Sequence, residues 1–165
     1  MDRPNMLRRA LSALDQLPAE ARTQARSRAL GGTVPFVGTA GIVALELGDD
    51  GGVFTIANER KVQNHIQGVH AAATALLAET ASGLTFGWHL PDDKLPLMKS
   101  MHIDYTRRSK GGLRAVAKLT DEQIEQMASE PRGAVDVAVT VTDEDGQEPV
   151  RCVMTWAWIP KKKKG

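Results

Sequence analysis

The sequence predicts an α+β fold in which a curved antiparallel sheet wraps around one central buried helix, preceded by an N-terminal helical extension. The helix is predicted by residues 70–84, which are rich in Ala and Leu and favour helix at nearly every position. Apolar side chains surround this helix instead of forming one stripe, a pattern typical of a buried helix. The sheet is predicted by segments on both sides of the helix in which apolar residues alternate with period two.

Residues 1–30 are predicted to form the helical extension. Their apolar positions recur at helical spacing at Leu7, Ala10, Leu11 and Leu14. Pro18 is expected to begin a second short helix, and Gly31-Gly32 to end it. We expect these helices to cover the outside of the main domain, residues 31–160, and to be peripheral to its core. Residues 161–165 form a basic tail, which we expect to be solvated.

Two strands are predicted before the buried helix and four after it. Residues 39–47 and 53–58 form a hairpin around the Gly- and Asp-rich turn at 48–52. Residues 88–93 are expected to be a loop, followed by strands over 98–106 and 113–119 and a short helix over 121–130. The last two strands cover 135–141 and 150–158.

Composition and charge exclude several classes of function. A length of 165 residues predicts one domain, and a formal net charge of +1 gives no electrostatic argument for nucleic acid binding. Neither a signal peptide nor an apolar run of membrane-spanning length is present, so we expect a cytoplasmic protein with no membrane partner. Cys152 lies in an alternating apolar run and is expected to be a buried strand residue, not a nucleophile.

No cluster of metal-ligating residues is apparent in the sequence. His65, His89 and His102 have no partners at the spacing that metal sites use. We therefore expect neither a metal nor a cofactor.

A motif around the start of the buried helix carries a family resemblance. Asn64 stands six residues before His70, and Glu79 stands nine residues after it. This pattern resembles the hotdog-fold acyl-CoA thioesterases of the phenylacetate-pathway type. A bacterial branch of thioesterase-like domains of unassigned function is more similar, because it also has Asn-His, His-Ala and a Leu-Ala-Glu ending. The resemblance covers roughly residues 34–158 and implies the hotdog fold and the hydrolysis of an acyl-CoA thioester.

Residues around the helix start depart from the pattern of the first family. Its Gly is found one position later, at Gly68, and its His-Gly-Gly is replaced by His70-Ala71-Ala72. The Ala71 methyl group narrows the approach to the helix, but a backbone amide is still present there.

The resemblance implies a catalytic role for four residues. The N–H of Ala71 would hold the thioester oxygen as charge develops on it, since a helix N-terminus offers unpaired amides. Glu79 would be the base or the nucleophile. Asn64 would orient water or the thioester carbonyl, and His70 would shape the site. Alternatively, Asn64 is a loop or capping side chain, and Glu79 is a structural carboxylate paired with an Arg such as Arg107 or Arg108.

Candidate substrate-binding residues are Gly68, Arg107, Arg108 and Lys110. The three cations follow the predicted third strand, where they could meet the phosphates of coenzyme A. A solvated strand end is an equally good interpretation of the same charges.

The spacing of the motif also predicts an oligomer. His70 and Glu79 are separated by about half a revolution and by about 13 Å of helical rise, so they point to opposite sides of one helix. An antiparallel partner helix would bring Glu79 of one chain towards Asn64, His70 and Ala71 of the other. We therefore expect a homodimer with two shared sites, or a dimer of such dimers.

Two other interpretations use the same fold. The protein could be a non-enzymatic module that binds acyl-CoA, although a pure binder does not require a carboxylate beside the thioester. It could also be a dehydratase acting on 3-hydroxyacyl thioesters, although the Pro-Gly surroundings typical of that class do not follow His70.

Overall fold

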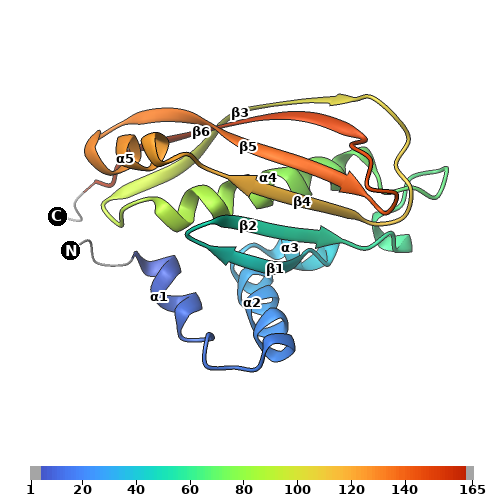
Figure 1. Ribbon diagram of the computed structural model, residues 1–165, viewed down its shortest axis with the longest axis horizontal. Helices are drawn as coiled ribbons and strands as arrows, with labels where there is room; N and C mark the ends of the chain where they lie inside the picture. Colours follow the sequence, from blue (N-terminus) through green and yellow to red (C-terminus); the bar gives the residue numbers. More distant parts are fainter. Residues whose placement is uncertain (1–4, 163–165) are drawn as a thin grey trace.

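The computed structural model describes residues 5–162, in which one antiparallel sheet wraps around one long helix, α4 (Figure 1). The six strands lie in the order β1-β2-β4-β5-β6-β3, and every neighbouring pair is antiparallel. Their bounds are β1 Val43–Gly48, β2 Gly51–Ile56, β3 Lys94–Tyr105, β4 Leu113–Lys118, β5 Gly133–Asp143 and β6 Val150–Pro160. The architecture predicted from the sequence, six strands around one helix, is confirmed.

The central helix α4 spans Ala71–His89 and is longer than predicted. Trp88 and His89, which we expected in a loop, form its last turn. Leu77, Ala78 and Phe86 are completely buried, so most of the helix is enclosed as expected.

One side of α4 is not covered by the sheet. Half-exposed positions recur along this side at Ala75, Leu76, Glu79 and Gly83. Spacings of three and four residues place them on one stripe of the helix. The sheet curves around the rest of α4 and leaves this stripe uncovered.

The C-terminal half of α4 is fixed against β6 by Trp156. The indole N–H of Trp156 donates a hydrogen bond of 2.9 Å to the hydroxyl of Ser82, and its ring stacks with Phe86 at a centroid distance of 5.8 Å. A Cβ atom at Gly83 would lie 2.4 Å from the Trp156 ring. Glycine at this position therefore allows the indole to lie directly against the helix.

Residues 5–162 contain five further helices around this core. Their bounds are α1 Met6–Ser12, α2 Ala19–Thr33, α3 Pro35–Ala40, the 3-10 helix Arg60–Val62 and α5 Asp121–Ser129. The helix α3 occupies the place where we expected the first strand to begin at residue 39. Pro35 lies in its first turn, and Gly41 ends it in the left-handed conformation with φ of 75°, so strand pairing starts only at Val43.

We expected the N-terminal helices to be peripheral to the core, but two of their leucines are buried in it. Leu11 and Leu30 are 2% and 6% exposed and belong to the same apolar cluster as the sheet and α4. The boundary that we placed after residue 30 falls inside α2. Gly31 and Gly32 do not end that helix, which continues to Thr33.

Asn5 attaches α1 to the end of α4. Its side-chain amide donates to the carbonyls of Gly87, Trp88 and Leu90 at 2.8, 3.0 and 2.7 Å. Its side-chain oxygen accepts the N–H of Arg8 and so caps α1. A single buried residue therefore satisfies groups at the start of one helix and at the end of another.

The strand β3 forms one edge of the sheet. It pairs with β6 on one side, and its other side has no partner strand in the described chain. Large apolar side chains are exposed on β3, namely Leu95, Leu97, Met101 and Tyr105. A long apolar edge strand of this kind is usually covered in natural proteins.

The basic tail and a membrane-spanning helix were both considered in the sequence. Lys161 and Lys162 of the basic tail are exposed, whereas residues 163–165 lie outside the described part of the chain. Among the helices of residues 5–162, none has the length and apolar character needed to cross a membrane.

Candidate active site

Two cavities lie along α4, one at its start and one at its middle. The first has a volume of about 150 Å³ and lies between the loop before α4, the first turn of α4 and the loop after β3. It is lined by five of the predicted site residues, Asn64, Gly68, Ala71, Arg107 and Arg108. Segments distant in the sequence, around residues 64–71 and 105–109, thus meet at the helix N-terminus.

The loop over residues 64–68 is shaped by Asn64. Its side-chain oxygen accepts the backbone N–H groups of Ile66 at 3.0 Å and Gly68 at 3.1 Å. Gln67 takes a left-handed conformation with φ of 63°, which closes the turn. Asn64 therefore acts as a loop side chain, one of the two roles considered for it. These two hydrogen bonds occupy the side-chain oxygen of Asn64. Its side-chain NH₂ group is the donor that stays available at the cavity.

His70 is the N-cap of α4. Its Nδ1 atom accepts the N–H of Ala72 at 3.0 Å. The preceding amide, that of Ala71, has no protein acceptor within residues 5–162, because the first amides of a helix lack an intrahelical partner. The Tyr105 hydroxyl donates to the Ala71 carbonyl at 2.6 Å and fixes the peptide on the other side.

Two arginines give this first cavity a positive rim. Arg108 donates to the carbonyl of Ile66 at 2.9 Å, and Arg107 donates to the side chain of Gln147 at 3.0 Å. Both side chains are exposed. Lys110 does not line the cavity but forms an ion pair of 3.0 Å with Asp145, and this hydrogen bond raises its pKa.

The second cavity surrounds Glu79 at the middle of α4. Its volume is about 180 Å³, and its lining is almost entirely apolar. Thr80, Gly83 and Leu84 of α4 contribute one side, Trp156 of β6 and Pro96 of β3 another, and Leu30, Val34 and Val37 of the N-terminal helices a third. Glu79 is the one charged residue among these lining residues.

The carboxylate of Glu79 is not neutralised by a cation. Within the described chain it forms no ion pair, and Arg107 and Arg108 are engaged elsewhere. Burial raises the pKa of Glu79 above its ordinary value. A partly desolvated, unpaired carboxylate is a group poised to accept a proton or to attack.

The two cavities are separate within one chain. Ala71 and Glu79 are eight residues apart, which corresponds to about 12 Å along the helix axis. One thioester cannot contact both groups of the same chain.

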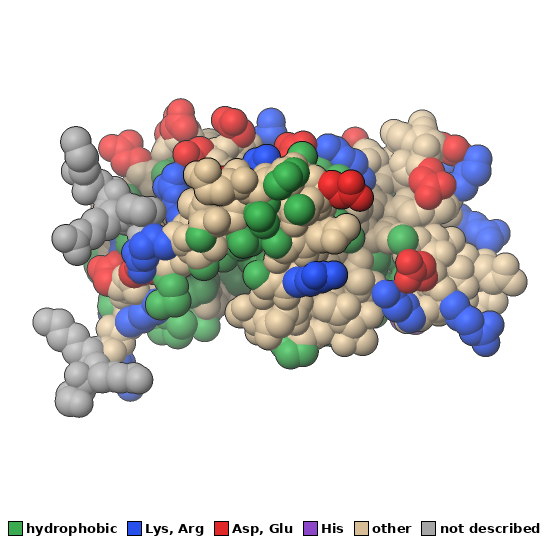
Figure 2. All heavy atoms as spheres, turned by 90° about the horizontal axis from the view of Figure 1, so that it is seen from below, with side chains coloured by type: hydrophobic (Ala, Val, Ile, Leu, Met, Phe, Trp, Pro, Cys, Tyr) green, Lys and Arg blue, Asp and Glu red, His purple; other side chains and the backbone are tan. Residues whose placement is uncertain are grey.

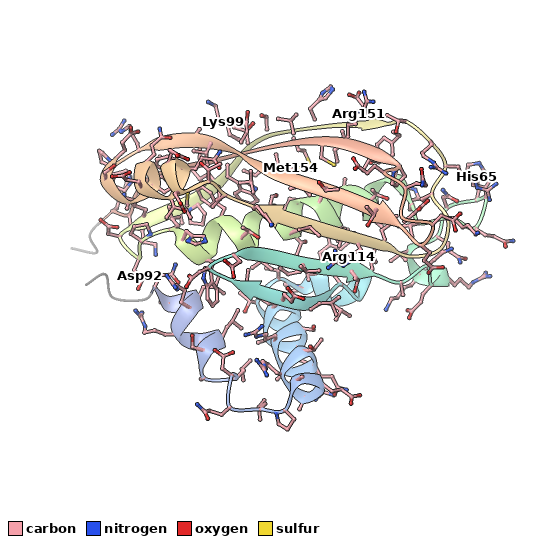
Figure 3. The ribbon with its side chains drawn as sticks, in the orientation of Figure 1. His65, Asp92, Lys99, Arg114, Arg151 and Met154 are labelled. Carbon is pink, nitrogen blue, oxygen red and sulfur yellow. The ribbon has the colours of Figure 1, made fainter. Side chains whose placement is uncertain are left out.

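The remaining reactive side chains lie outside both cavities. His65 lies at the tip of the loop before α4 (Figure 3), and His102 pairs with Asp104 on the exposed edge strand at 3.3 Å. Burial raises the pKa of the Cys152 thiol to about 11, so it is protonated at neutral pH, in keeping with a structural residue. No group of three or more His, Cys, Asp or Glu side chains is arranged to hold a metal within residues 5–162.

The apolar surroundings of Glu79 were missed in the sequence. Leu30, Val34 and Val37 have helical spacing of four and three residues, which is a usable signal for one face. Gly31-Gly32 and Pro35 interrupt that stretch and obscured the signal. Trp156 also lines this cavity, and it reaches α4 only when the sheet folds around the helix.

A family model matches residues 22–159 and therefore most of the chain. It is described as a domain of unknown function, DUF4442. No curated protein matches the sequence.

Several solved structures share the fold. A probable thioesterase of otherwise unknown function from Pseudomonas aeruginosa is 23% identical, with 88% of this chain and 97% of that chain covered and a TM-score of 0.76. A thioesterase from Haemophilus influenzae is 15% identical, with 88% and 92% covered and a TM-score of 0.62. A thioesterase family protein from Silicibacter pomeroyi is 13% identical, with 82% and 96% covered and a TM-score of 0.66. The predicted hotdog fold is confirmed by this likeness.

Proposed function

This chain belongs to the DUF4442 family, and we propose that it hydrolyses an acyl-CoA thioester to a free acid and coenzyme A. The observation that carries the proposal is the placement of two complementary groups on one helix. Ala71 offers an unpaired amide beside a basic cavity, and Glu79 offers an unpaired carboxylate in an apolar one. The likeness of the fold to proteins named as thioesterases supports this assignment.

The first cavity would bind the thioester head. The Ala71 amide and the partial positive charge of the α4 N-terminus would stabilise the oxyanion that forms when the carbonyl is attacked. The NH₂ group of Asn64 would hold the carbonyl or the attacking water. Arg107 and Arg108 at the rim would meet the phosphates of coenzyme A, because guanidinium groups bind phosphate in a bidentate manner.

Glu79 would supply the electron pair for the reaction. As a general base it takes a proton from water, whose oxygen attacks the carbonyl carbon while the carbon–sulfur bond breaks and the thiolate leaves. As a nucleophile its oxygen attacks the carbonyl carbon, the carbon–sulfur bond breaks and the thiolate leaves, and water then cleaves the resulting anhydride to release the acid and restore Glu79. Both routes require the carboxylate form.

We further propose that the complete site forms between two chains. Ala71 and Glu79 of one chain cannot reach one thioester, whereas an antiparallel pair of α4 helices brings Glu79 of one chain towards Ala71 of the other. The open stripe of α4 and the exposed apolar edge of β3 are surfaces that such a homodimer would cover. A dimer of these dimers is compatible with the same contact.

The test is release of free thiol from a panel of acyl-CoA substrates, including aromatic ones as the resemblance to the phenylacetate-pathway type suggests. We expect turnover that depends on enzyme concentration and is absent for the alkyl thioethers of coenzyme A. Binding of acyl-CoA without thiol release would favour the non-enzymatic module. Formation of an enoyl thioester from 3-hydroxyacyl-CoA would favour the dehydratase. Either result would overturn the proposal.

A further inference from the structure

The cavity around Glu79 has a wall that lies outside the sequence motif. Leu30, near the end of α2, and Val37, in α3, are 6% and 4% exposed and pack into the core. Val34 lies between these two helices, and at 44% exposure it stands at the mouth of the cavity. Hydrophobic side chains gather around a hollow on the face of the molecule seen from below (Figure 2).

The opposite wall contains Trp156, which several contacts hold in place. Trp156 is held by its hydrogen bond to Ser82 and by its contact with Gly83, where no side chain can be added without a clash. The indole therefore sets a fixed limit to the depth of the cavity. The N-terminal helices set its width.

The size and charge of the cavity restrict what it can hold. Its volume of about 180 Å³ slightly exceeds that of an apolar cavity of roughly 150 Å³ that binds benzene. An aromatic ring or a chain of about six carbons fills such a space. A second carboxylate on the ligand would be desolvated beside the unpaired Glu79, which disfavours dicarboxylic acyl groups.

We propose that this cavity is an acyl-binding chamber and that the N-terminal helices, through Val34 at its mouth, restrict the acyl group to an uncharged aryl or six-carbon chain. The inference rests on the proposed thioester hydrolysis and deepens it by naming the acyl class. It also gives the N-terminal helices a part in substrate selection.

Binding is tested without turnover by methyl NMR of the full-length protein. Hexanamide and phenylacetamide are neutral analogues of the two acyl groups. We expect both to shift the methyl signals of Leu30, Val34, Val37 and Leu84, which line the cavity. Val34→Trp should abolish these shifts by filling the mouth. The matched control, Phe36→Trp, alters an exposed residue of α3 outside the cavity and should retain them.

Selectivity is tested with acetyl-, hexanoyl-, phenylacetyl-, succinyl- and palmitoyl-CoA. We expect kcat/KM to be largest for the hexanoyl and phenylacetyl substrates. Val34→Trp should lower the ratio of hexanoyl to acetyl turnover by about tenfold or more, the scale at which apolar pockets discriminate. Phe36→Trp should leave that ratio as in the wild type.

The two proposals fail in different ways. Methyl shifts at the cavity without hydrolysis of any thioester would retain the chamber and overturn the proposed reaction. Hydrolysis in which palmitoyl-CoA equals hexanoyl-CoA, or in which Val34→Trp and Phe36→Trp have the same ratio, would overturn the chamber and retain the reaction. Shifts confined to other methyl groups would also overturn the chamber.

Discussion

The two cavities on α4 differ in almost every property although one helix contributes to both. The cavity at the helix start has a free amide, the side chain of Asn64 and two arginines at its rim, beside apolar residues such as Val69 and Val150. We call it the polar cavity after the hydrogen-bonding groups that it presents. The cavity at the helix middle is apolar and contains a single carboxylate, that of Glu79.

The difference follows from the physics of a helix. Unpaired N–H groups and partial positive charge exist only at the N-terminus, so that end suits an oxyanion or a phosphate. The middle of a helix has no free backbone groups, and its environment is set by side chains alone. A thioester has both a polar head and an apolar acyl group, and the two cavities together match these two parts.

The largest expected effect is the loss of thiol release when the carboxylate of the apolar cavity is replaced. Glu79→Gln keeps the size and the burial of the side chain but removes its ability to accept a proton or to attack. We expect thiol release to fall by about 10²–10⁴-fold. The control Glu125→Gln, on the exposed face of α5, should turn over normally. Near wild-type turnover of Glu79→Gln would mean that the apolar cavity contains no catalytic group.

The next effect isolates the amide of the polar cavity. Proline is well accepted in the first turn of a helix, and His70 already has the extended conformation that a following proline requires, with φ of −63° and ψ of 144°. Ala71→Pro therefore removes one N–H with little change to the fold. We expect turnover to fall by about 10²–10³-fold, the usual cost of one oxyanion donor.

The matched variant for this position is Ala71→Ser, which changes the side chain and keeps the amide. It should retain most of the activity. Equal losses in Ala71→Pro and Ala71→Ser would show that the side chain, and not the backbone donor, matters at this end of α4.

A smaller effect concerns the end of α4 that contributes to neither cavity. Asn5→Ala would leave the carbonyls of Gly87, Trp88 and Leu90 without their donor. We expect the free energy of unfolding to fall by about 2 kcal/mol, measured by urea denaturation, with kcat little changed in the folded protein. Gln24→Ala, at an exposed position of α2, is the control and should be neutral. An unchanged midpoint for Asn5→Ala would contradict the anchoring role of Asn5.

The smallest expected effect has the opposite sign. Since burial raises the pKa of Glu79, the folded protein holds that proton more tightly than the unfolded chain. Stability is therefore lost as the pH rises from the ordinary glutamate range through the raised pKa. Glu79→Gln should gain about 2 °C in Tm at neutral pH and nothing below the ordinary range. A lower Tm at neutral pH would indicate that Glu79 stabilises the fold.

The fold could be predicted because its signals are local. Alternation along 135–141 and the apolar surface of the central helix are properties of short segments, and they indicated the strands and the helix in the right order. The error at residue 39 arose because short alternating runs also fit a helix of six residues, α3, and Gly41 was interpreted as a strand residue.

The candidate site could be predicted only in part, and the cause is distance in the sequence. Asn64, Ala71 and Glu79 belong to one continuous motif. The wall made by Val34 and Trp156 depends on packing between segments that are more than 100 residues apart. The ion pair of Lys110 could not be predicted for the same reason, because its partner Asp145 lies in the turn between β5 and β6.

The central claim is that the two unlike cavities act together across two chains, and subunit mixing tests it most directly. Asn64→Ala disables the polar cavity and Glu79→Gln the apolar one, so each variant alone should be nearly inactive. After subunit exchange, each mixed dimer would contain one site with both defects and one with neither. At random pairing about a quarter of wild-type thiol release should return. If exchange is demonstrated by mass-tagged subunits and no activity returns, each site is built from a single chain and the account is contradicted.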